Sequence, residues 1–150
     1  MIRFNYHFKV RYKDIDQMGV VYYSRYFEYF EQGRTELLNS IGLNVSEIEN
    51  QGIFLPVVLA HCEYNKGARF EDKITIISKI NELPKSRLKI NYLITKYDPI
   101  EKIAFGFTEH AFMKKNGKPT RPPKIIFDSI KHNLEAWSLS FYYFLFSAFF

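Results

Sequence analysis

Two aspartates near the N-terminus, Asp14 and Asp16, are the residues whose type and spacing most directly suggest chemistry. They stand at the end of an extended segment, Gly19 follows them, and a helix is predicted to begin near Ser24. This order places a carboxylate on a turn beside the free N–H groups at the start of a helix. A carboxylate can attack a polarised carbonyl or direct water onto it, and N–H donors can stabilise the oxyanion that develops. We therefore predict an active site within residues 10–26.

The composition indicates one globular domain without cross-links. A chain of 150 residues can bury roughly 68–70% of the surface that it exposes when unfolded. Its single cysteine, Cys62, excludes an internal disulfide and suits a reducing compartment. The N-terminus lacks the apolar core of a secretory signal, and no apolar run reaches the roughly 20 residues of a membrane-spanning helix. We therefore expect a cytoplasmic protein, or one held at the inner face of the cytoplasmic membrane.

The formal net charge of +5 is spread along the chain. Solvated surface lysines account for it, and a mild preference for an anionic partner is the alternative. No basic run is interleaved with aromatic residues that could stack on bases, which argues against a nucleic-acid partner.

A strand and a long helix are predicted on either side of the candidate site. Residues Ile2–Tyr12 alternate apolar and polar side chains, as in a strand with one buried face, and His7 falls on the exposed face. Apolar residues then recur at helical spacing from Ser24 to Ile41. Ser24 is the candidate N-cap, and Gly42 stands where a glycine commonly ends a helix.

Four further strands are predicted after a connection that includes a helical turn at Val45–Asn50. They lie at Ile53–Asn65, Asp72–Leu83, Arg87–Tyr97 and Ile103–Lys115, where alternating segments are separated by turn residues. This order predicts an α+β fold in which a five-stranded antiparallel sheet curls around one long helix. Such a sheet leaves a long edge exposed, and pairing with a second copy would cover it. We therefore predict a homodimer with a continuous sheet.

Two charged residues, Glu31 and Arg34, fall on the apolar stripe of the predicted helix. Because they are three residues apart, their side chains can be neighbours. We interpret them as an internal ion pair where the helix meets another subunit or a cleft. The alternative is that Glu31 faces the substrate.

The C-terminal part, residues 125–150, is predicted to pack as a helix and a tail on the domain formed by residues 1–124 or on a neighbouring subunit. A polar, proline-rich link covers Lys114–Lys124, and a final helix is predicted from Phe127 to Trp137. The tail, Phe141–Phe150, is uncharged and mostly aromatic, and such a surface is seldom left in water. Shallow insertion at a membrane interface and an unstructured end are the alternatives to packing.

The residues that carry a family resemblance are Tyr12, Asp14, Asp16, Gly19, Val20, Val21, Tyr22, Tyr23 and Tyr26, followed by Phe30, Glu31, Arg34 and Glu36. This pattern resembles the 4-hydroxybenzoyl-CoA thioesterase family, and within it the bacterial acyl-CoA thioesterases associated with the Tol–Pal system. The similarity covers about residues 4–123. It implies the hotdog fold, a sheet wrapped around one helix, and hydrolysis of acyl-CoA thioesters without a cofactor or a bound metal. It also implies a homodimer, and beyond that a dimer of dimers.

The resemblance assigns roles to individual residues. Asp16 matches the catalytic carboxylate, which acts as a nucleophile or as a general base toward water. Tyr23 matches the position whose backbone N–H polarises the carbonyl. Gly19 matches a turn glycine that lets the backbone approach the substrate closely, and Val20 and Tyr22 are expected to bind substrate beside it.

Asp14 competes with Asp16 for the role of acid. We prefer Asp16, because it matches the catalytic carboxylate of the family. An aspartate such as Asp14, in a loop near a helix start, is often only a cap or a turn former. Arg25 departs from the family pattern, in which an asparagine commonly stands two residues after the tyrosine. This departure leaves the helix start and the acyl selectivity open.

Contacts to the rest of the substrate are less clearly marked in the sequence. Candidates for binding the CoA nucleotide are Lys85 and Arg87 in a predicted hairpin, and Lys66 and Arg69 after the second strand. The acyl group depends on how aromatic side chains pack around the pocket, among them Tyr22, Phe27, Phe54 and Tyr64. The sequence therefore does not predict the length or the type of the acyl chain.

Two other functions are alternatives to thioester hydrolysis. A hotdog dehydratase of acyl-carrier substrates needs a histidine paired with a carboxylate, but His61, His110 and His132 are predicted on exposed faces away from Asp16. A non-catalytic adaptor that binds acyl chains or a membrane-linked partner, with the tail as its docking element, is the alternative from another class.

Overall fold

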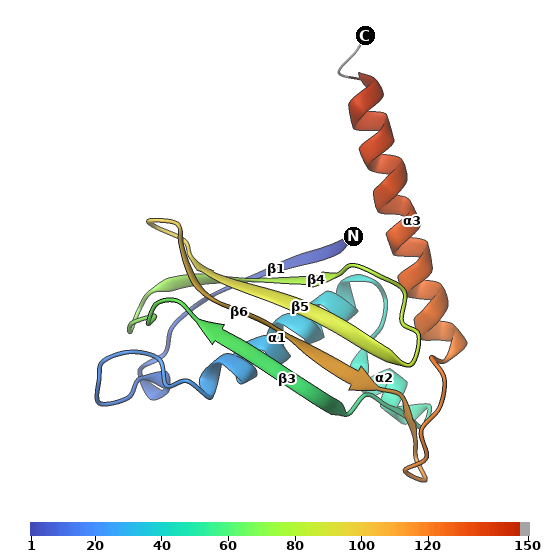
Figure 1. Ribbon diagram of the computed structural model, residues 1–150, viewed down its shortest axis with the longest axis horizontal. Coiled ribbons are helices and arrows are strands. Elements are labelled where there is room, and N and C mark those ends of the chain that lie inside the picture. Colours follow the sequence, from blue (N-terminus) through green and yellow to red (C-terminus); the bar gives the residue numbers. More distant parts are fainter. Residues whose placement is uncertain (148–150) are drawn as a thin grey trace.

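Five antiparallel strands form one sheet that wraps around a central helix (Figure 1). The computed structural model describes residues 1–147, and their side chains through residue 137. The sheet order is β1–β4–β5–β6–β3, with these strands at Ile2–Lys9, Lys73–Ile80, Arg87–Lys96, Glu101–Ala111 and Val57–Tyr64. The helix is α1, Arg25–Ser40. The predicted α+β architecture is confirmed, and each strand pair in the sheet is antiparallel.

Two of the predicted strands are each divided in two. The segment predicted as one strand over Ile53–Asn65 contains β2 (Ile53–Phe54) and β3, and that over Ile103–Lys115 contains β6 and β7 (Met113–Lys114). Pro56, between β2 and β3, has no N–H for a strand ladder. β2 and β7 pair with each other apart from the main sheet, so the prediction of unbroken strands is wrong at both places.

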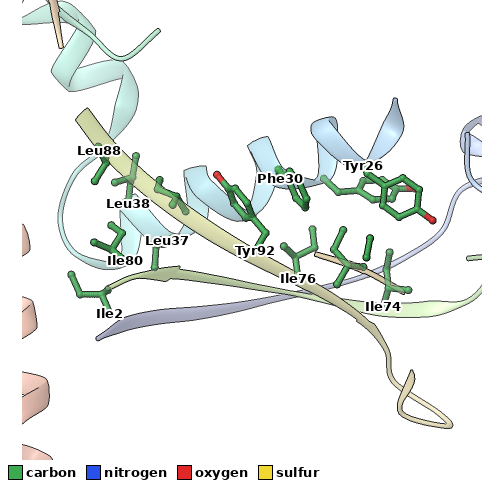
Figure 2. Packing of buried hydrophobic residues seen from close by; sticks show 14 of the residues in the cluster. Ile2, Tyr26, Phe30, Leu37, Leu38, Ile74, Ile76, Ile80, Leu88 and Tyr92 are labelled. Atoms are coloured by element: carbon green, nitrogen blue, oxygen red, sulfur yellow. The ribbon is translucent and has the colours of Figure 1, made fainter. Parts of the chain in front are cut away.

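The core lies between α1 and the inner face of the sheet (Figure 2). Phe30 stacks on Tyr92 of β5 with 4.3 Å between the ring centroids and 8° between the planes. At Gly33 the helix approaches β4 so closely that a Cβ would lie 2.7 Å from Cγ2 of Ile76. The fully buried side chains include Tyr26, Tyr29, Leu37 and Leu38 of α1, Ile74, Ile76 and Ile80 of β4, and Leu88 and Ile90 of β5.

The ends of α1 differ in how well the sequence marks them. Ser24 is the N-cap residue, as predicted, but its backbone is already helical and its side chain makes no capping hydrogen bond. At the other end Gly42 adopts φ +77°. The N–H groups of Gly42 and Leu43 donate to the carbonyls of Asn39 and Leu38 at 3.0 and 2.9 Å. This Schellman arrangement ends the helix as the glycine predicted.

Two short helical segments flank the longer elements. The predicted turn at Val45–Asn50 is confirmed as α2, where the Asn44 side chain accepts from the N–H of Glu47 at 3.1 Å. A 3-10 turn, η1 (Tyr12–Asp14), ends the extended segment that begins with β1. It carries the chain from the sheet toward the start of α1.

The inner face of β6 is built from small and polar residues. Ala104 and Thr108 are buried together with His110, which we predicted on an exposed face. Phe105 and Phe107 alternate with them on the other face, where lysine ammonium groups lie over both rings. The phenylalanines of β6 therefore lie on its outer face. His110 alternates with them and faces inward, so the prediction that it is exposed is wrong. His61 on β3 and His132 on the last helix are exposed, as predicted.

His110 is held neutral inside a short polar network. Its Nε2 lies 2.7 Å from the Thr108 hydroxyl, which lies 2.8 Å from the Tyr92 hydroxyl. Its Nδ1 lies 3.2 Å from the carbonyl oxygen of Leu55. Burial, and then the nearby charge of Arg34, lower the pKa of His110 to about 4. A neutral ring has one protonated nitrogen. In one tautomer Nδ1 donates to Leu55 and Nε2 accepts from Thr108, and in the other Nδ1 accepts from Arg34 and Nε2 donates to Thr108.

Glu31 and Arg34 do not form the ion pair that we predicted. Glu31 is exposed, and Nη1 of Arg34 lies 3.3 Å from Nδ1 of His110. The ion pairs among the described side chains do not include one between these two residues. Both residues instead line a groove of about 290 Å³ between α1 and β3, together with Phe27 and Ala60. Within one chain, the ion-pair interpretation is therefore wrong.

Strand β3 is an edge of the sheet, paired only with β6. Its apolar side chains are unusually exposed, with 50% for Val57, 47% for Val58 and 43% for Leu59. An edge strand with exposed apolar residues offers both backbone hydrogen-bonding groups and an apolar surface to a partner. This edge is the exposed sheet edge that the sequence predicted.

The last helix is longer than predicted. Helix α3 runs over Lys124–Ser147 and extends away from the sheet (Figure 1). Its first half is attached to the core through the buried Ile126 and Ile130, and Oγ of Ser129 donates to the carbonyl of Ile41 at 2.6 Å. The predictions for the side chains of the aromatic tail lie outside the described residues. No helix in the part of the chain that the structure describes combines the length and the apolar character needed to cross a membrane.

Candidate active site

The chain segment that carries Asp16 forms a tight hairpin between η1 and α1. The Asp16 N–H donates to the carbonyl of Val20, and the Gly19 N–H donates to the carbonyl of Asp16, both at 3.0 Å. Gly19 has φ +76°, which favours glycine at this bulged turn position. Ile15 and Val21 pair as an isolated antiparallel bridge beneath it. The turn therefore fixes Asp16 on a short, rigid support.

The Asp16 carboxylate lines a cavity of about 280 Å³ at the start of α1. One of its oxygens, Oδ1, accepts from the N–H of Met18 at 2.8 Å, and within the described residues Oδ2 has no partner. Four tyrosines line the cavity, Tyr22, Tyr23, Tyr26 and Tyr64, together with Met18, Val20, Val21, Asn65, Lys66 and Gly67. A carboxylate with one free oxygen in a cavity lined by tyrosines and apolar side chains is a good candidate for a base or a nucleophile.

At the start of α1, Tyr23 lines the same cavity and carries a free backbone N–H. The Tyr22 carbonyl accepts from the N–H of Arg25 at 2.9 Å. Because a trans peptide is planar, the N–H of Tyr23 points opposite to that carbonyl, away from the helix. No hydrogen bond formed within the described residues uses the Tyr23 N–H. The positive end of the helix dipole adds to its ability to stabilise a negative charge.

The carbonyl of Tyr23 is held from the other side of the cavity. The Tyr64 hydroxyl, at the end of β3, donates to it at 3.1 Å, and the Tyr26 N–H reaches it at 3.4 Å. Partial desolvation of this half-exposed side chain, as the main cause, raises the pKa of Tyr64 to about 12, so the phenol remains a donor at neutral pH. Burial also raises the pKa of Tyr26, and a hydrogen bond with Tyr23 raises that of Tyr22. The cavity therefore combines one carboxylate with neutral phenols.

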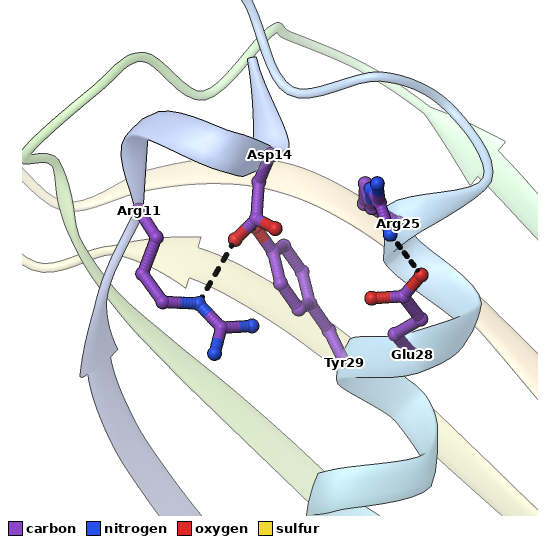
Figure 3. A network of polar contacts seen from close by, with 5 residues as sticks. All are labelled: Arg11, Asp14, Arg25, Glu28 and Tyr29. Carbon is purple, nitrogen blue, oxygen red and sulfur yellow. Dashed lines mark hydrogen bonds and ion pairs between the residues drawn. The ribbon is translucent and has the colours of Figure 1, made fainter.

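The two aspartates lie in different surroundings. Asp14 is only 1% exposed, and its Oδ2 accepts from the Tyr29 hydroxyl at 3.1 Å and from Nε of Arg11 at 3.3 Å (Figure 3). Asp16 is partly exposed and lines the cavity. The side chain of Asp14 points into the interior, so of the two only Asp16 borders the space that a substrate could occupy.

The predicted cations are divided between the two ends of the sheet. Lys66 lines the Asp16 cavity, and its Nζ pairs with Oε1 of Glu101 at 2.6 Å. Arg69 is exposed on the loop beside that cavity without lining it. Lys85 and Arg87 lie at the opposite end, because Arg87 opens β5 opposite Ala111 at the end of β6. One chain alone does not bring all four cations together.

Some cavity residues were not predicted from the sequence. Tyr26, Asn65 and Gly67 line it, and a Cβ on Gly67 would lie 2.5 Å from Cγ1 of Val20. The loop that carries Asn65 and Gly67 is fixed to the hairpin by the Val21 N–H, which donates to the carbonyl of Ala68 at 2.8 Å. The only sequence signal was the turn-forming Asn-x-Gly after β3. Phe54, by contrast, does not line this cavity, although we named it among the pocket aromatics.

Arg25, the residue that departs from the family pattern, does not line the cavity. Its guanidinium pairs with Glu28 one turn along α1 (Figure 3). Metal chemistry has no obvious ligands, since the described residues contain no cluster of three or more His, Cys, Asp or Glu side chains that could hold an ion.

The chain is similar to known proteins in sequence and in fold. The model of the Thioesterase-like superfamily matches residues 10–134. The chain belongs to this superfamily. A protein of Aquifex aeolicus is 32% identical over 128 residues, covering 85% of this chain and 98% of its own. An acyl-CoA thioesterase of Haemophilus influenzae is 30% identical over 81 residues, covering 53% of this chain and 60% of its own.

A solved structure extends the similarity to the fold. The DHNA-CoA thioesterase of Staphylococcus aureus superimposes with a TM-score of 0.83 at 26% identity, covering 93% of this chain and 94% of its own. The hotdog fold and the thioesterase membership that the motif implied are thereby confirmed. Family membership does not by itself assign roles to individual residues, which are inferred from the geometry of the site.

Proposed function

We propose that the protein hydrolyses an acyl-CoA thioester to the free acid and CoA. The observation that carries this proposal is that one cavity is lined by both Asp16 and Tyr23, whose backbone N–H has no partner among the described residues. A thioester carbonyl bound there would have its oxygen at the helix start and its carbon within reach of the carboxylate. The names of the relatives, which include acyl-CoA thioesterases, support the same reaction.

Two courses of the reaction are compatible with this site. In the first, an Asp16 oxygen attacks the thioester carbon, the C–S bond breaks, and CoA leaves as a thiolate that takes up a proton. Water then cleaves the mixed anhydride and releases the acid. In the second, Asp16 takes a proton from a water that attacks the same carbon. The C–S bond then breaks, and the CoA thiolate leaves and takes up a proton. In both courses, the Tyr23 N–H stabilises the negative charge that develops on the carbonyl oxygen. Such electrostatic stabilisation is usually the largest single contribution to lowering the barrier.

A second subunit would bring the remaining cations to the site. We propose a homodimer in which β3 pairs with β3 of a second copy across a two-fold axis. Such pairing is antiparallel, so the start of one β3 lies beside the end of the other. Lys85 and Arg87 stand at the start-of-β3 end of the sheet, and Asp16 at the other end. The pairing would therefore place these two cations of one subunit toward the Asp16 cavity of its partner, where they could bind the CoA phosphates.

Release of free thiol from a panel of acyl-CoAs tests the function. The panel contains short, medium and long aliphatic chains and one aromatic acyl group. We expect turnover by the wild type and a fall of at least about 1,000-fold in kcat in Asp16→Asn. Asn can still accept the Met18 N–H, so the fold is retained. Binding of acyl-CoA without turnover by the wild type would favour the adaptor, and full activity of Asp16→Asn would remove Asp16 from the mechanism.

A further inference from the structure

The carboxylate of Asp14 is a costly feature of the interior. Its side chain is fully inaccessible to solvent, and Oδ1 has no hydrogen-bond partner among the described residues. Leaving a buried charged oxygen without a partner destabilises a fold, and an apolar residue of similar size would commonly be more stable. A group that reduces stability in this way calls for a functional explanation.

Asp14 connects three segments that meet behind the Asp16 cavity. Through Oδ2 it binds Arg11 of the segment that follows β1 and the hydroxyl of Tyr29 in the second turn of α1. Through its carbonyl it accepts from the N–H of Tyr22 at 2.9 Å. Figure 3 shows the carboxylate between Arg11 and the Tyr29 ring. One residue thus holds the beginning and the end of the catalytic hairpin to the helix.

The Tyr29 side of this link is rigid. Tyr29 is fully buried, and its ring packs against Phe8 at 4.6 Å and Tyr26 at 5.8 Å between centroids. Burial, and then the charge of Asp14, raise the pKa of Tyr29 far above the neutral range, so its hydroxyl remains a donor. Neither Asp14 nor Tyr29 lines the cavity, and neither can touch a substrate there.

The groups fixed by Asp14 are the two on which the proposed reaction depends. Asp16 follows Asp14 by two residues on the same hairpin, and the Tyr22–Tyr23 peptide bears the N–H donor. A rotation of the hairpin against α1 would change the distance between the Asp16 carboxylate and the Tyr23 N–H. An error of about 1 Å in such a distance can reduce turnover by about 100-fold.

We infer that the Asp14–Tyr29 hydrogen bond is a positioning device that sets Asp16 against the Tyr23 N–H. The inference rests on the proposed function. Asp14 and Tyr29 act through other residues, so removing either should affect the rate of the chemical step more than the binding of substrate.

Three variants test this inference in the full-length protein: Asp14→Asn, Tyr29→Phe and the double variant. Thiol release is measured at saturating acyl-CoA, at a temperature where circular dichroism shows each variant folded. We expect each single variant to lower kcat by about tenfold or more, with KM within about threefold of the wild type. The double variant should be no slower than the slower single variant, because both changes break the same link.

Tyr92→Phe is the matched control. It also removes a buried, hydrogen-bonded hydroxyl from the core between α1 and the sheet, but at a place remote from Asp14. We expect it to lower the melting temperature about as much as Tyr29→Phe while kcat stays within about twofold. Should Asp14→Asn fail to fold, the comparison of Tyr29→Phe with Tyr92→Phe still decides.

The outcomes separate this inference from the proposed function. If the wild type shows no turnover of any acyl-CoA, the function itself is wrong. If the wild type is active and Asp16→Asn is not, but Tyr29→Phe and Asp14→Asn keep the wild-type kcat, the positioning role is overturned. Strictly additive losses in the double variant would also contradict it.

Discussion

The hydroxyl of Tyr64 donates to the main-chain oxygen of Tyr23 at 3.1 Å, across a separation of 41 residues. Tyr64 is the last residue of the edge strand β3, and Tyr23 stands one residue before the N-cap of α1. The bond therefore joins the exposed edge of the sheet to the peptide group beside the proposed oxyanion donor. This contact links the position of the end of β3 to that helix start.

Tyr64→Phe should reduce activity with little loss of stability. Tyr64 is 46% exposed, and its ring would keep its edge contact with Tyr26, 5.2 Å between centroids. The change removes the hydrogen bond to Tyr23 and the weaker one with the Cys62 thiol. A hydrogen bond contributes about 1 kcal/mol or less at an exposed position. We expect kcat to fall several-fold, measured by thiol release, and the melting temperature to change by no more than a few degrees. An unchanged kcat would show that the helix start needs no support from β3.

The buried His110 predicts a loss of stability in mild acid. Its folded-state pKa of about 4 lies below the ordinary value of 6.5, so between these values the unfolded chain binds more protons. The stabilisation is complete above pH 6.5 and is lost as the pH falls toward 4, by up to about 3 kcal/mol. Urea unfolding at pH 7.0, 5.5 and 4.5 measures this difference.

Two substitutions isolate the contribution of that histidine. His110→Gln should be less stable than the wild type at pH 7 but should lose less stability between pH 7.0 and 4.5. The same change at His61, which is exposed on β3, should leave the pH dependence of unfolding as it is in the wild type. Equal slopes for wild type and His110→Gln would mean that His110 is not the buried group responsible.

Gly106 and Gly19 should respond very differently to an added methyl group. At Gly106 a Cβ would lie 2.0 Å from the carbonyl oxygen of His61 on the neighbouring β3, so the two strands would have to separate. Gly106→Ala should therefore cost about 3 kcal/mol or more in the free energy of unfolding. At Gly19 a Cβ has no neighbour within 4 Å, and only the φ of +76° opposes it, at about 1 kcal/mol. Denaturant titration of both variants checks the order, and equal losses would contradict it.

The proposed dimer predicts that a charge on β3 reduces both association and turnover. Leu59→Lys places an ammonium on the exposed apolar edge, where self-pairing would bring two like charges together. We expect sedimentation to shift from dimer to monomer and kcat/KM to fall at least about tenfold, because the partner's cations would be lost. Ile100→Lys is the control, since Ile100 is 82% exposed at the turn between β5 and β6. A fully active monomer of Leu59→Lys would refute the shared site.

Local patterns in the sequence were sufficient to predict the fold, but not to predict which face of every strand is buried. Period-two alternation located the strands, and the helical stripe with its terminal glycine located α1. The pattern failed at β6, because its inner face carries Ala104, Thr108 and His110 while the phenylalanines face outward. It also failed at Arg34, whose nearest polar partner comes from β6, 76 residues away.

The candidate site was predictable only in the segment that the motif covers. Asp16, Gly19 and the predicted helix start near Ser24 are close in sequence, so their order suggested a turn beside a helix start. Tyr23 was added by the family resemblance. Asn65 and Gly67 reach the same cavity only because the Val21 N–H binds the carbonyl of Ala68. No periodicity in one segment encodes such a contact between two distant loops.

The sheet order has a consequence for the time course of folding. β4, β5 and β6 follow one another through short turns, so they can pair early in folding. β1 pairs with β4, which is far from it in the sequence, from Ile2 with Ile80 to Lys9 with Lys73. Closing so large a loop is slow, because its entropic cost precedes the contacts that repay it. The hairpin that carries Asp16 follows β1 in the chain, so its position depends on the docking of β1. On refolding, the meander therefore becomes protected from hydrogen exchange first, and enzymatic activity returns last.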